Sequence, residues 1–142
     1  MDYNQAFYNI LDEVTEIALA SSVNDMPNVR IVSFCCDDSR PGVLYFTSKG
    51  ASQKVTEFTQ NSKAAFATPP IGKTITHIKS NSAEVVKSQY GFHDLKDAFI
   101  AKTPEYKDIY LANADNLDVF ELRVKEALVV VDYGNYGFAK FS

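Results

Sequence analysis

The sequence has no long apolar run and no excess of positive charge. No hydrophobic stretch approaches the roughly 20 residues that a membrane-spanning helix needs, and the start, MDYNQAFYN, lacks the basic and apolar regions of a signal peptide. We therefore expect a cytoplasmic protein with no membrane partner. The net charge of −4 argues against general nucleic-acid binding, which depends on a basic surface that neutralises phosphates, but it is compatible with a local basic pocket.

Cysteine and histidine are also scarce, with two of each. Cys35 and Cys36 are adjacent, and neighbouring side chains on a strand point to opposite faces, so they form neither a disulfide framework nor a paired metal site. His77 and His93 lie far apart and have no ligand-like spacing with cysteine or carboxylate residues. We expect no metal site.

Size and composition predict one globular domain over residues 1–142. The chain is long enough to bury a core, and 46% hydrophobic with 23% charged residues is typical of a folded protein rather than a disordered one. Neither an internal repeat nor a low-complexity linker divides it.

Hydrophobic spacing predicts a helix followed by a β meander. Apolar residues recur at helical spacing from Phe7 to Ala18, and Asp2 or Asn4 can cap this helix. ALASSV and NVRIVSFCC follow as strands. The segment DDSRPG then separates NVRIVSFCC from VLYFTS, which predicts a hairpin centred near Ser39 and Arg40. Counting outward from that centre places Arg30 opposite the region from Thr47 to Lys49.

The rest of the chain predicts more strands than helices. A short helix from about Gln53 to Gln60 precedes strands in AAFATPP and TITHIKSNSAEVVKSQ, and two helices lie between Phe92 and Ala112. In the last strand, LDVFELRVKEALVVVDY, apolar residues alternate with Glu121 and other charged residues. A continuous meander of five or six strands predicts a mainly β protein with flanking helices, built as an antiparallel barrel.

The segment LYFTSKGASQKVTEF, residues 44–58, has the composition of a phosphate site. A helix N-terminus offers free backbone N–H groups, and close backbone approach is possible at Gly50. Hydroxyls can come from Thr47, Ser48 and Ser52, and positive charge from Lys49, Lys54 and the neighbouring Arg30. The segment matches neither GxxxxGK[ST] nor GxGxxG, so a P-loop and a Rossmann site are not supported. Taken alone, the arrangement is weak evidence, because serine, glycine and lysine are common in loops, and it favours an ordinary solvated loop.

The order RIVSF, a turn, LYFTSKGASQKVTEF, NSKAAFA and a long strand with AEV resembles the pyridoxamine 5′-phosphate oxidase-like, FMN-binding split-barrel family. The resemblance covers roughly residues 15 to 90 and, more loosely, the final strand. It implies that Arg30 and Lys54 bind the FMN phosphate, assisted by Thr47, Ser48 and Ser52.

The resemblance also implies positions for the flavin ring. The ring would lie against Ile31, Val32 and Ser33, largely through backbone groups, with Phe46 and Thr47 bordering the cleft. Lys49 and Gln53 complete the predicted cofactor-binding set. Gln53 stands where true oxidases often carry a second basic residue, and the C-terminus, DYGNYGFAKFS, lacks the Arg-Leu-x-Pro type segment of their substrate site. Authentic pyridoxamine 5′-phosphate oxidase activity is therefore not expected.

The expected function is flavin redox chemistry on an unidentified small substrate, in a homodimer with the flavin site at the subunit interface. No side chain stands out as a catalytic acid or base, because Tyr45, Tyr90 and His77 are more simply explained as structural residues. The alternative is a non-catalytic binding or sensing protein that holds flavin, haem or a deazaflavin.

Overall fold

The computed structural model describes residues 1–49 and 52–141. In its first half, helix α1 (Tyr3–Glu13) precedes strands β1 (Glu16–Val23), β2 (Met26–Ser33), β3 (Cys35–Cys36) and β4 (Val43–Lys49), and helix α2 (Gln53–Gln60) follows them. The second half contains β5 (Lys63–Ala67), β6 (His77–Gly91), α3 (Phe92–Lys102), α4 (Lys107–Asn113), β7 (Leu117–Asp132) and β8 (Asn135–Lys140). Short 3₁₀ turns occupy Pro104–Tyr106 and Ala114–Asn116.

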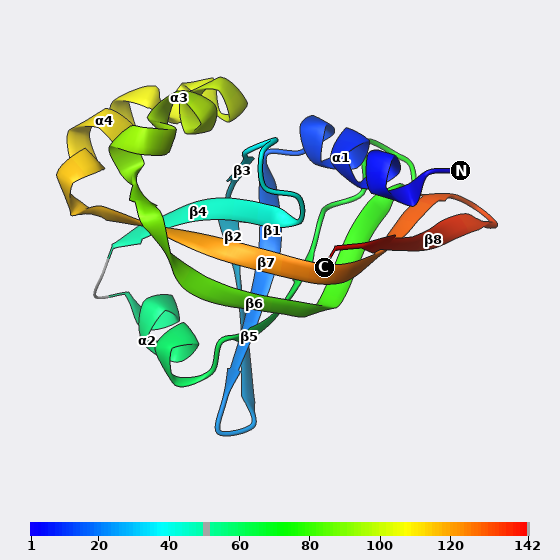
Figure 1. Cartoon of the computed structure of the whole chain (residues 1–142), viewed down its shortest axis with the longest axis horizontal. Helices are drawn as coiled ribbons and strands as arrows, with labels where there is room; N and C mark the ends of the chain where they lie inside the picture. The colour runs from blue at the N-terminus through cyan, green and yellow to red at the C-terminus, as the bar shows by residue number, and fades with distance from the viewer. Residues whose placement is uncertain (50–51, 142) are drawn as a thin grey trace.

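The strands form one antiparallel sheet in the order β2-β1-β5-β6-β7-β4-β3 (Figure 1). The eighth strand, β8, pairs with the second half of β7. The sheet curls so that β2 and β4 approach each other, but no ladder of hydrogen bonds joins them in the described residues. An antiparallel barrel that is open between two strands is a split barrel, so the predicted fold class is confirmed.

The predicted hairpin of residues 28–36 with β4 is largely wrong. Its centre is right, because Cys35 pairs with Tyr45 and Cys36 with Leu44. The pairing ends there, and β2 forms its ladder with β1, in which Arg30 lies opposite Leu19. The turn residues Asn24 and Asp25 adopt positive φ values of 52° and 63°, which makes β1 and β2 a tight hairpin and takes β2 away from β4.

The two faces of β4 belong to two different hydrophobic clusters. Leu44 and Phe46 point into the barrel, where α1 covers the core, and Phe46 stacks on Phe120 with ring centroids 5.7 Å apart. Val43 and Tyr45 point the other way, into a second cluster under α3 and α4. Helices therefore bury this part of the sheet on both sides.

Two further expectations need correction. The first helix is shorter than expected: it ends at Glu13, and Ile17 and Ala18 belong to β1. Its predicted cap is confirmed, since Asp2 accepts a hydrogen bond from the Gln5 N–H at 3.1 Å. Strand β8 was not predicted. It packs closely against α1, because a Cβ added at Gly137 would lie 2.2 Å from the Tyr3 ring. Glu121, which alternates with apolar residues along β7, is only 2% exposed. Among the described residues, no helix is long and apolar enough to cross a membrane.

Candidate functional site

Helix α2 starts beside the end of β4, as the sequence predicts. Ser52 is the N-cap residue, and its hydroxyl lies 2.7 Å from the hydroxyl of Ser48, which is buried. Neither hydroxyl caps the helix, and in the described part of the chain no other side chain does so. The first backbone N–H groups of α2 and two hydroxyls therefore lie together, with the positive end of the helix dipole. Gly50, which was expected to allow close approach, lies outside the described residues.

Arg30 reaches α2 from the inner face of β2. Its side chain lies on the same face as Asn28 and Val32, because alternate residues of a strand share a face. The guanidinium lies 5.6 Å from the centroid of the Phe58 ring, and Phe58 is buried in the barrel core. This contact holds the arginine side chain against the barrel core.

Arg30 is also held by a residue that sequence reasoning missed. Glu57 of α2 accepts a hydrogen bond from Arg30 Nη2 at 2.7 Å, and from the Ser21 hydroxyl at 2.6 Å. Asn28 and Gln53 donate to its other oxygen at 3.0 and 3.2 Å. Glu57 is 6% exposed. The hydrogen bond from Ser21 lowers the pKa of Glu57 most; burial opposes this shift, and Arg30 and Gln53 add to it.

Lys54 lies on the same side of α2, three residues before Glu57. Burial lowers the pKa of Lys54, and the nearby positive charge of Arg30 lowers it further. No carboxylate in residues 1–49 and 52–141 lies within 4.0 Å of its amine. The site therefore brings two neighbouring cations together, and only Arg30 is paired with an anion.

The remaining predicted residues lie on two different faces. The side chains of Val32 and Phe46 are buried in the barrel core, so only their backbones can border a cleft. The alternation of each strand turns Ile31, Ser33, Thr47 and Lys49 to the other side. Gln53 lies at the start of α2, next to Glu57. A ligand that touched the whole predicted set would have to pass around the edge of β2.

That edge is accessible, because β2 pairs only with β1 among the described strands. An edge strand presents a row of backbone N–H and C=O groups that can bind a ligand. The outer face next to it carries exposed apolar side chains, with Val29 69% and Ile31 61% exposed. A groove of about 530 Å³ crosses this face, lined by small and apolar residues that include Ala18, Ala20, Ala65, Ala67, Leu128 and Phe138.

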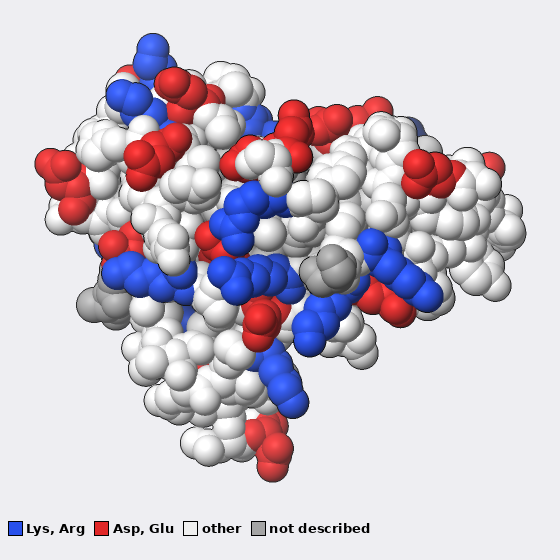
Figure 2. All heavy atoms as spheres, viewed as in Figure 1, with Lys and Arg blue, Asp and Glu red and all other residues white. Residues whose placement is uncertain are grey.

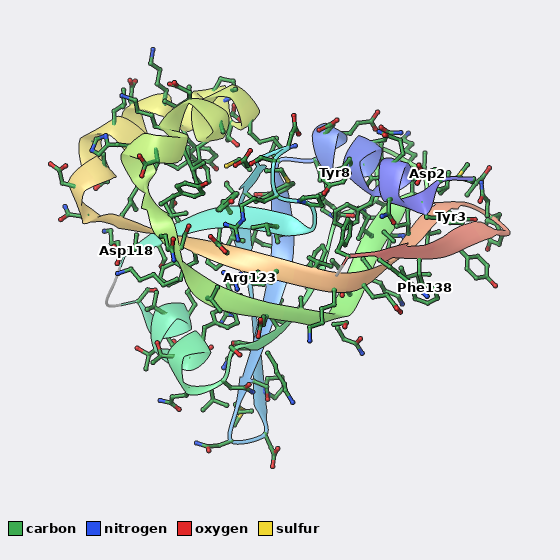
Figure 3. The ribbon with its side chains drawn as sticks, viewed as in Figure 1. Asp2, Tyr3, Tyr8, Asp118, Arg123 and Phe138 are labelled. Atoms are coloured by element: carbon green, nitrogen blue, oxygen red, sulfur yellow. The ribbon has the colours of Figure 1, made fainter. Side chains whose placement is uncertain are left out.

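A second group of cations lines a groove that does not include Arg30 or Lys54. Figure 2 shows a band of lysine and arginine side chains across the middle of one face. A groove of about 850 Å³ on the molecule is lined by Arg40, Arg123, Lys125 and Lys140, and by none of the predicted site residues. Arg123 projects from the middle of β7 (Figure 3).

The two arginines of this group bind Glu121. Arg40 donates to both of its carboxylate oxygens, at 2.6 and 3.1 Å, and Arg123 Nε donates at 3.0 Å. The Ser88 hydroxyl completes the set at 2.8 Å. Burial tends to raise the pKa of Glu121, but the hydrogen bonds from Arg40, Ser88 and Arg123 outweigh it, and the pKa is lowered.

The residues around Arg30 and Lys54 fit the phosphate of a flavin nucleotide. A phosphate monoester needs several donors and compensating positive charge, and this site has a guanidinium, an ammonium, two hydroxyls and a helix N-terminus. The carboxylate of Glu57 opposes an anion at this site. The described residues contain no group of three or more metal-ligating side chains.

Several solved structures share the fold. A NimC/NimA family protein from Clostridium acetobutylicum has a TM-score of 0.72 at 20% identity, over 99% of this chain and 95% of its own. An FAD-binding protein from Mesorhizobium loti has a TM-score of 0.66 at 12% identity, over 87% and 88%. A haem-binding protein from Mycobacterium smegmatis has a TM-score of 0.76 at 13% identity. The match includes 96% of this chain but only 57% of that protein.

At these identities the structural likeness shows the fold alone. None of the curated proteins matches the chain closely enough to count as a relative. The sequence itself, however, matches the family described as pyridoxamine 5′-phosphate oxidase-like over residues 10–136, which includes β2, β4, α2 and the long strands β6 and β7. The chain therefore belongs to the pyridoxamine 5′-phosphate oxidase-like family.

Proposed function

We propose that this chain binds FMN with its phosphate between Arg30 and Lys54, and that it is a flavin-dependent oxidoreductase for a small substrate. The observation that carries the proposal is the position of Lys54 at the start of α2, beside Arg30 and with no carboxylate within 4.0 Å of its amine in the described residues. Its amine is half-buried beside another cation, and its pKa is lowered by burial and then by Arg30. An ammonium in this environment gains from any anion that binds next to it, and the hydroxyls of Ser48 and Ser52 lie at the start of the same helix.

The flavin ring would extend from the phosphate along the edge of β2. Residues 31–33 offer backbone groups there, and the exposed side chain of Ile31 gives an apolar contact. When bound, FMN supplies the redox chemistry, and the protein holds its phosphate, orients its ring and excludes water. The apolar character of the neighbouring face supports this arrangement.

The same proposal includes a homodimer. The outer face of β1 and β2 exposes Val29 and Ile31, next to the groove lined by alanines and Phe138. A contiguous apolar face of this kind is typical of an interface between subunits. Val29→Glu would place a charge on this face, and light scattering should then show a monomer where the parent protein is a dimer. A monomeric parent, measured with FMN present, would refute the dimer.

Fluorescence titration with FMN and riboflavin tests the phosphate site. Removing one charge-assisted contact from a partly buried site should raise the FMN dissociation constant about ten- to hundredfold in Lys54→Ala. Riboflavin has the same ring without the phosphate, so its affinity should stay the same in the variant and the parent. Equal FMN affinity in both proteins would show that Lys54 does not bind the phosphate.

Turnover separates an enzyme from a carrier. The FMN-loaded protein should be reduced by NADH or NADPH and reoxidised by a small acceptor, and a protein that is never reduced would be a flavin carrier or sensor.

Haem is the second candidate ligand, because one structural neighbour is a haem-binding protein. Haem iron needs an axial side chain such as histidine. His77 and His93 lie outside the apolar groove, and His77 Nδ1 is engaged with the Ile75 carbonyl at 2.5 Å. An absorption spectrum distinguishes the ligands, since haem gives an intense Soret band and flavin gives two bands in the near ultraviolet and blue.

A further inference from the structure

We infer that Glu57 limits the charge selectivity of the proposed phosphate site: it cancels one of the two positive charges, so that the site distinguishes less between a singly and a doubly charged phosphate. This inference rests on the proposed function, since it concerns the same site. It depends on the contacts of Glu57 with Arg30, Ser21, Asn28 and Gln53.

Glu57 is a fixed anion. Four donors from β1, β2 and α2 bind its two oxygens at 2.6 to 3.2 Å, and its side chain is buried. Ser21 and Asn28 face each other across the β1–β2 ladder, so the carboxylate is bound to the hairpin as well as to its own helix. A carboxylate held in this way cannot move away when a second anion arrives.

Arg30 can bind Glu57 and a phosphate together. Its Nη2 donates to Glu57 at 2.7 Å, and its Nη1 makes a longer contact of 3.3 Å with the Leu19 carbonyl. A guanidinium has five N–H donors, so others are available for a ligand. The contact with Glu57 therefore orients the guanidinium, while the negative charge of the carboxylate repels the phosphate that the guanidinium binds.

The charges around the site give the selectivity. Arg30 of β2 is the charged group that contacts the carboxylate in the described residues, and the other contacts come from Ser21, Asn28 and Gln53, which do not titrate. The charge of Lys54 lies near Arg30. Two cations and one anion leave a single net positive charge. Without the carboxylate, a phosphate would meet a net charge of two. Each negative charge of the phosphate therefore gains less in the presence of Glu57, and a dianion, which carries two such charges, loses most.

The experiment compares the parent protein with Glu57→Gln. Glutamine keeps the size of the side chain and can still accept from Ser21 and Arg30, but it removes the charge. FMN should bind about tenfold more tightly to the variant at neutral pH, and riboflavin affinity should be unchanged. Glu13→Gln is the matched control, because it changes the net charge of the protein by the same amount as Glu57→Gln. Glu13 is exposed at the end of α1, and α1 lies on the opposite side of the barrel from α2 (Figure 1). FMN affinity should not change in this control.

A pH series on the parent protein tests the same inference without a variant. The second proton of a phosphate monoester is lost near about pH 6. Glu57 stays ionised above its ordinary pKa, because its pKa is lowered in the fold. Between about pH 5 and pH 7, the FMN affinity of the parent should therefore rise less than that of Glu57→Gln, in which the forming dianion meets two uncancelled positive charges.

The outcomes separate the two proposals. If Lys54→Ala does not weaken FMN binding, the proposed phosphate site is wrong. If Lys54→Ala weakens it but Glu57→Gln leaves FMN affinity unchanged or lowers it, the phosphate site stands and the charge-selectivity role of Glu57 is refuted. A parent protein whose FMN affinity rises as steeply as that of Glu57→Gln from about pH 5 to pH 7 would refute that role as well.

Discussion

Glu57 and Glu121 are both buried carboxylates that bind arginine and serine, and they differ in how their surroundings use positive charge. Both cations near Glu121 contact it, Arg40 through two hydrogen bonds and Arg123 through one. Near Glu57 only Arg30 does so, and Lys54 remains without a carboxylate partner among the described residues. One cluster is complete within the protein, and the other has positive charge available for a ligand.

The pKa values of the cations express the same difference. The hydrogen bond to Glu121 raises the pKa of Arg40, so the protein stabilises this charge. Burial and the charge of Arg30 lower the pKa of Lys54, so the protein destabilises that one. Perturbed pKa values are enriched at functional sites, so the lowered lysine pKa next to hydroxyls and a helix N-terminus agrees with the proposed phosphate site.

The largest expected effect comes from removing Glu121. Glu121→Ala leaves Arg40 and Arg123 close together without their anion, and breaking a buried ion pair from one side costs several kcal/mol. Because both arginines are partly exposed, with 33% and 47% of their side chains accessible, solvent reduces that cost. Urea denaturation should show a loss of about 2–4 kcal/mol in the free energy of unfolding. A loss as small as that of a surface substitution would show that the cluster is not structural.

Arg30→Ala should have a smaller effect on stability. Among residues 1–49 and 52–141, Arg30 is the one cation that contacts Glu57, but Ser21, Asn28 and Gln53 still donate to the carboxylate after the substitution. We expect the free energy of unfolding to fall by about 1–2 kcal/mol, measured by the same denaturation. A larger loss than for Glu121→Ala would reverse the comparison between the clusters. Since Arg30→Ala changes stability as well as the site, Lys54→Ala is the cleaner test of phosphate binding.

The acid limb of the stability profile provides a third comparison. The pKa values of both glutamates are lowered in the fold from an ordinary value of 4.5. Their contribution to stability is therefore fully present above about pH 4.5, and is lost as the pH falls through the lowered values. Below that pH, the free energy of unfolding should fall less steeply with decreasing pH in Glu57→Gln and in Glu121→Gln than in the parent. Parallel declines of all three proteins would contradict the lowered pKa values.

The sequence predicted the cations of the site better than its anion. The prediction placed Arg30 near Lys54 through a hairpin register that is mostly wrong. In the structure the two residues lie close because β2 approaches β4, α2 packs against β1, and Arg30 bonds to Glu57 of α2. Glu57 was missed because a glutamate on a short helix is normally exposed. Its spacing from Lys54, three residues along the helix, was the only local signal that both share a face.

The burial of Glu121 was not predicted, for a related reason. Alternation along β7 correctly places it on the face opposite Phe120 and Leu122, but a strand pattern cannot show that other elements cover that face. Ser88 comes from β6, Arg40 from the loop before β4, and α3 and α4 pack over neighbouring residues. Burial of this glutamate depends on contacts between segments far apart in the sequence, which periodicity does not encode.

The smallest expected effect belongs to an exposed carboxylate. Asp118 lies near the start of β7 (Figure 3), 3.9 Å from the Lys87 amine, with 42% of the Asp118 side chain and 68% of the Lys87 side chain accessible. Water solvates both charges, so their attraction is small and is offset by the loss of side-chain freedom. Asp118→Asn should change the free energy of unfolding by less than about 0.5 kcal/mol, and the change should disappear at high salt. A cost similar to that of Glu121→Ala would mean that burial does not distinguish the structural carboxylates from the surface ones.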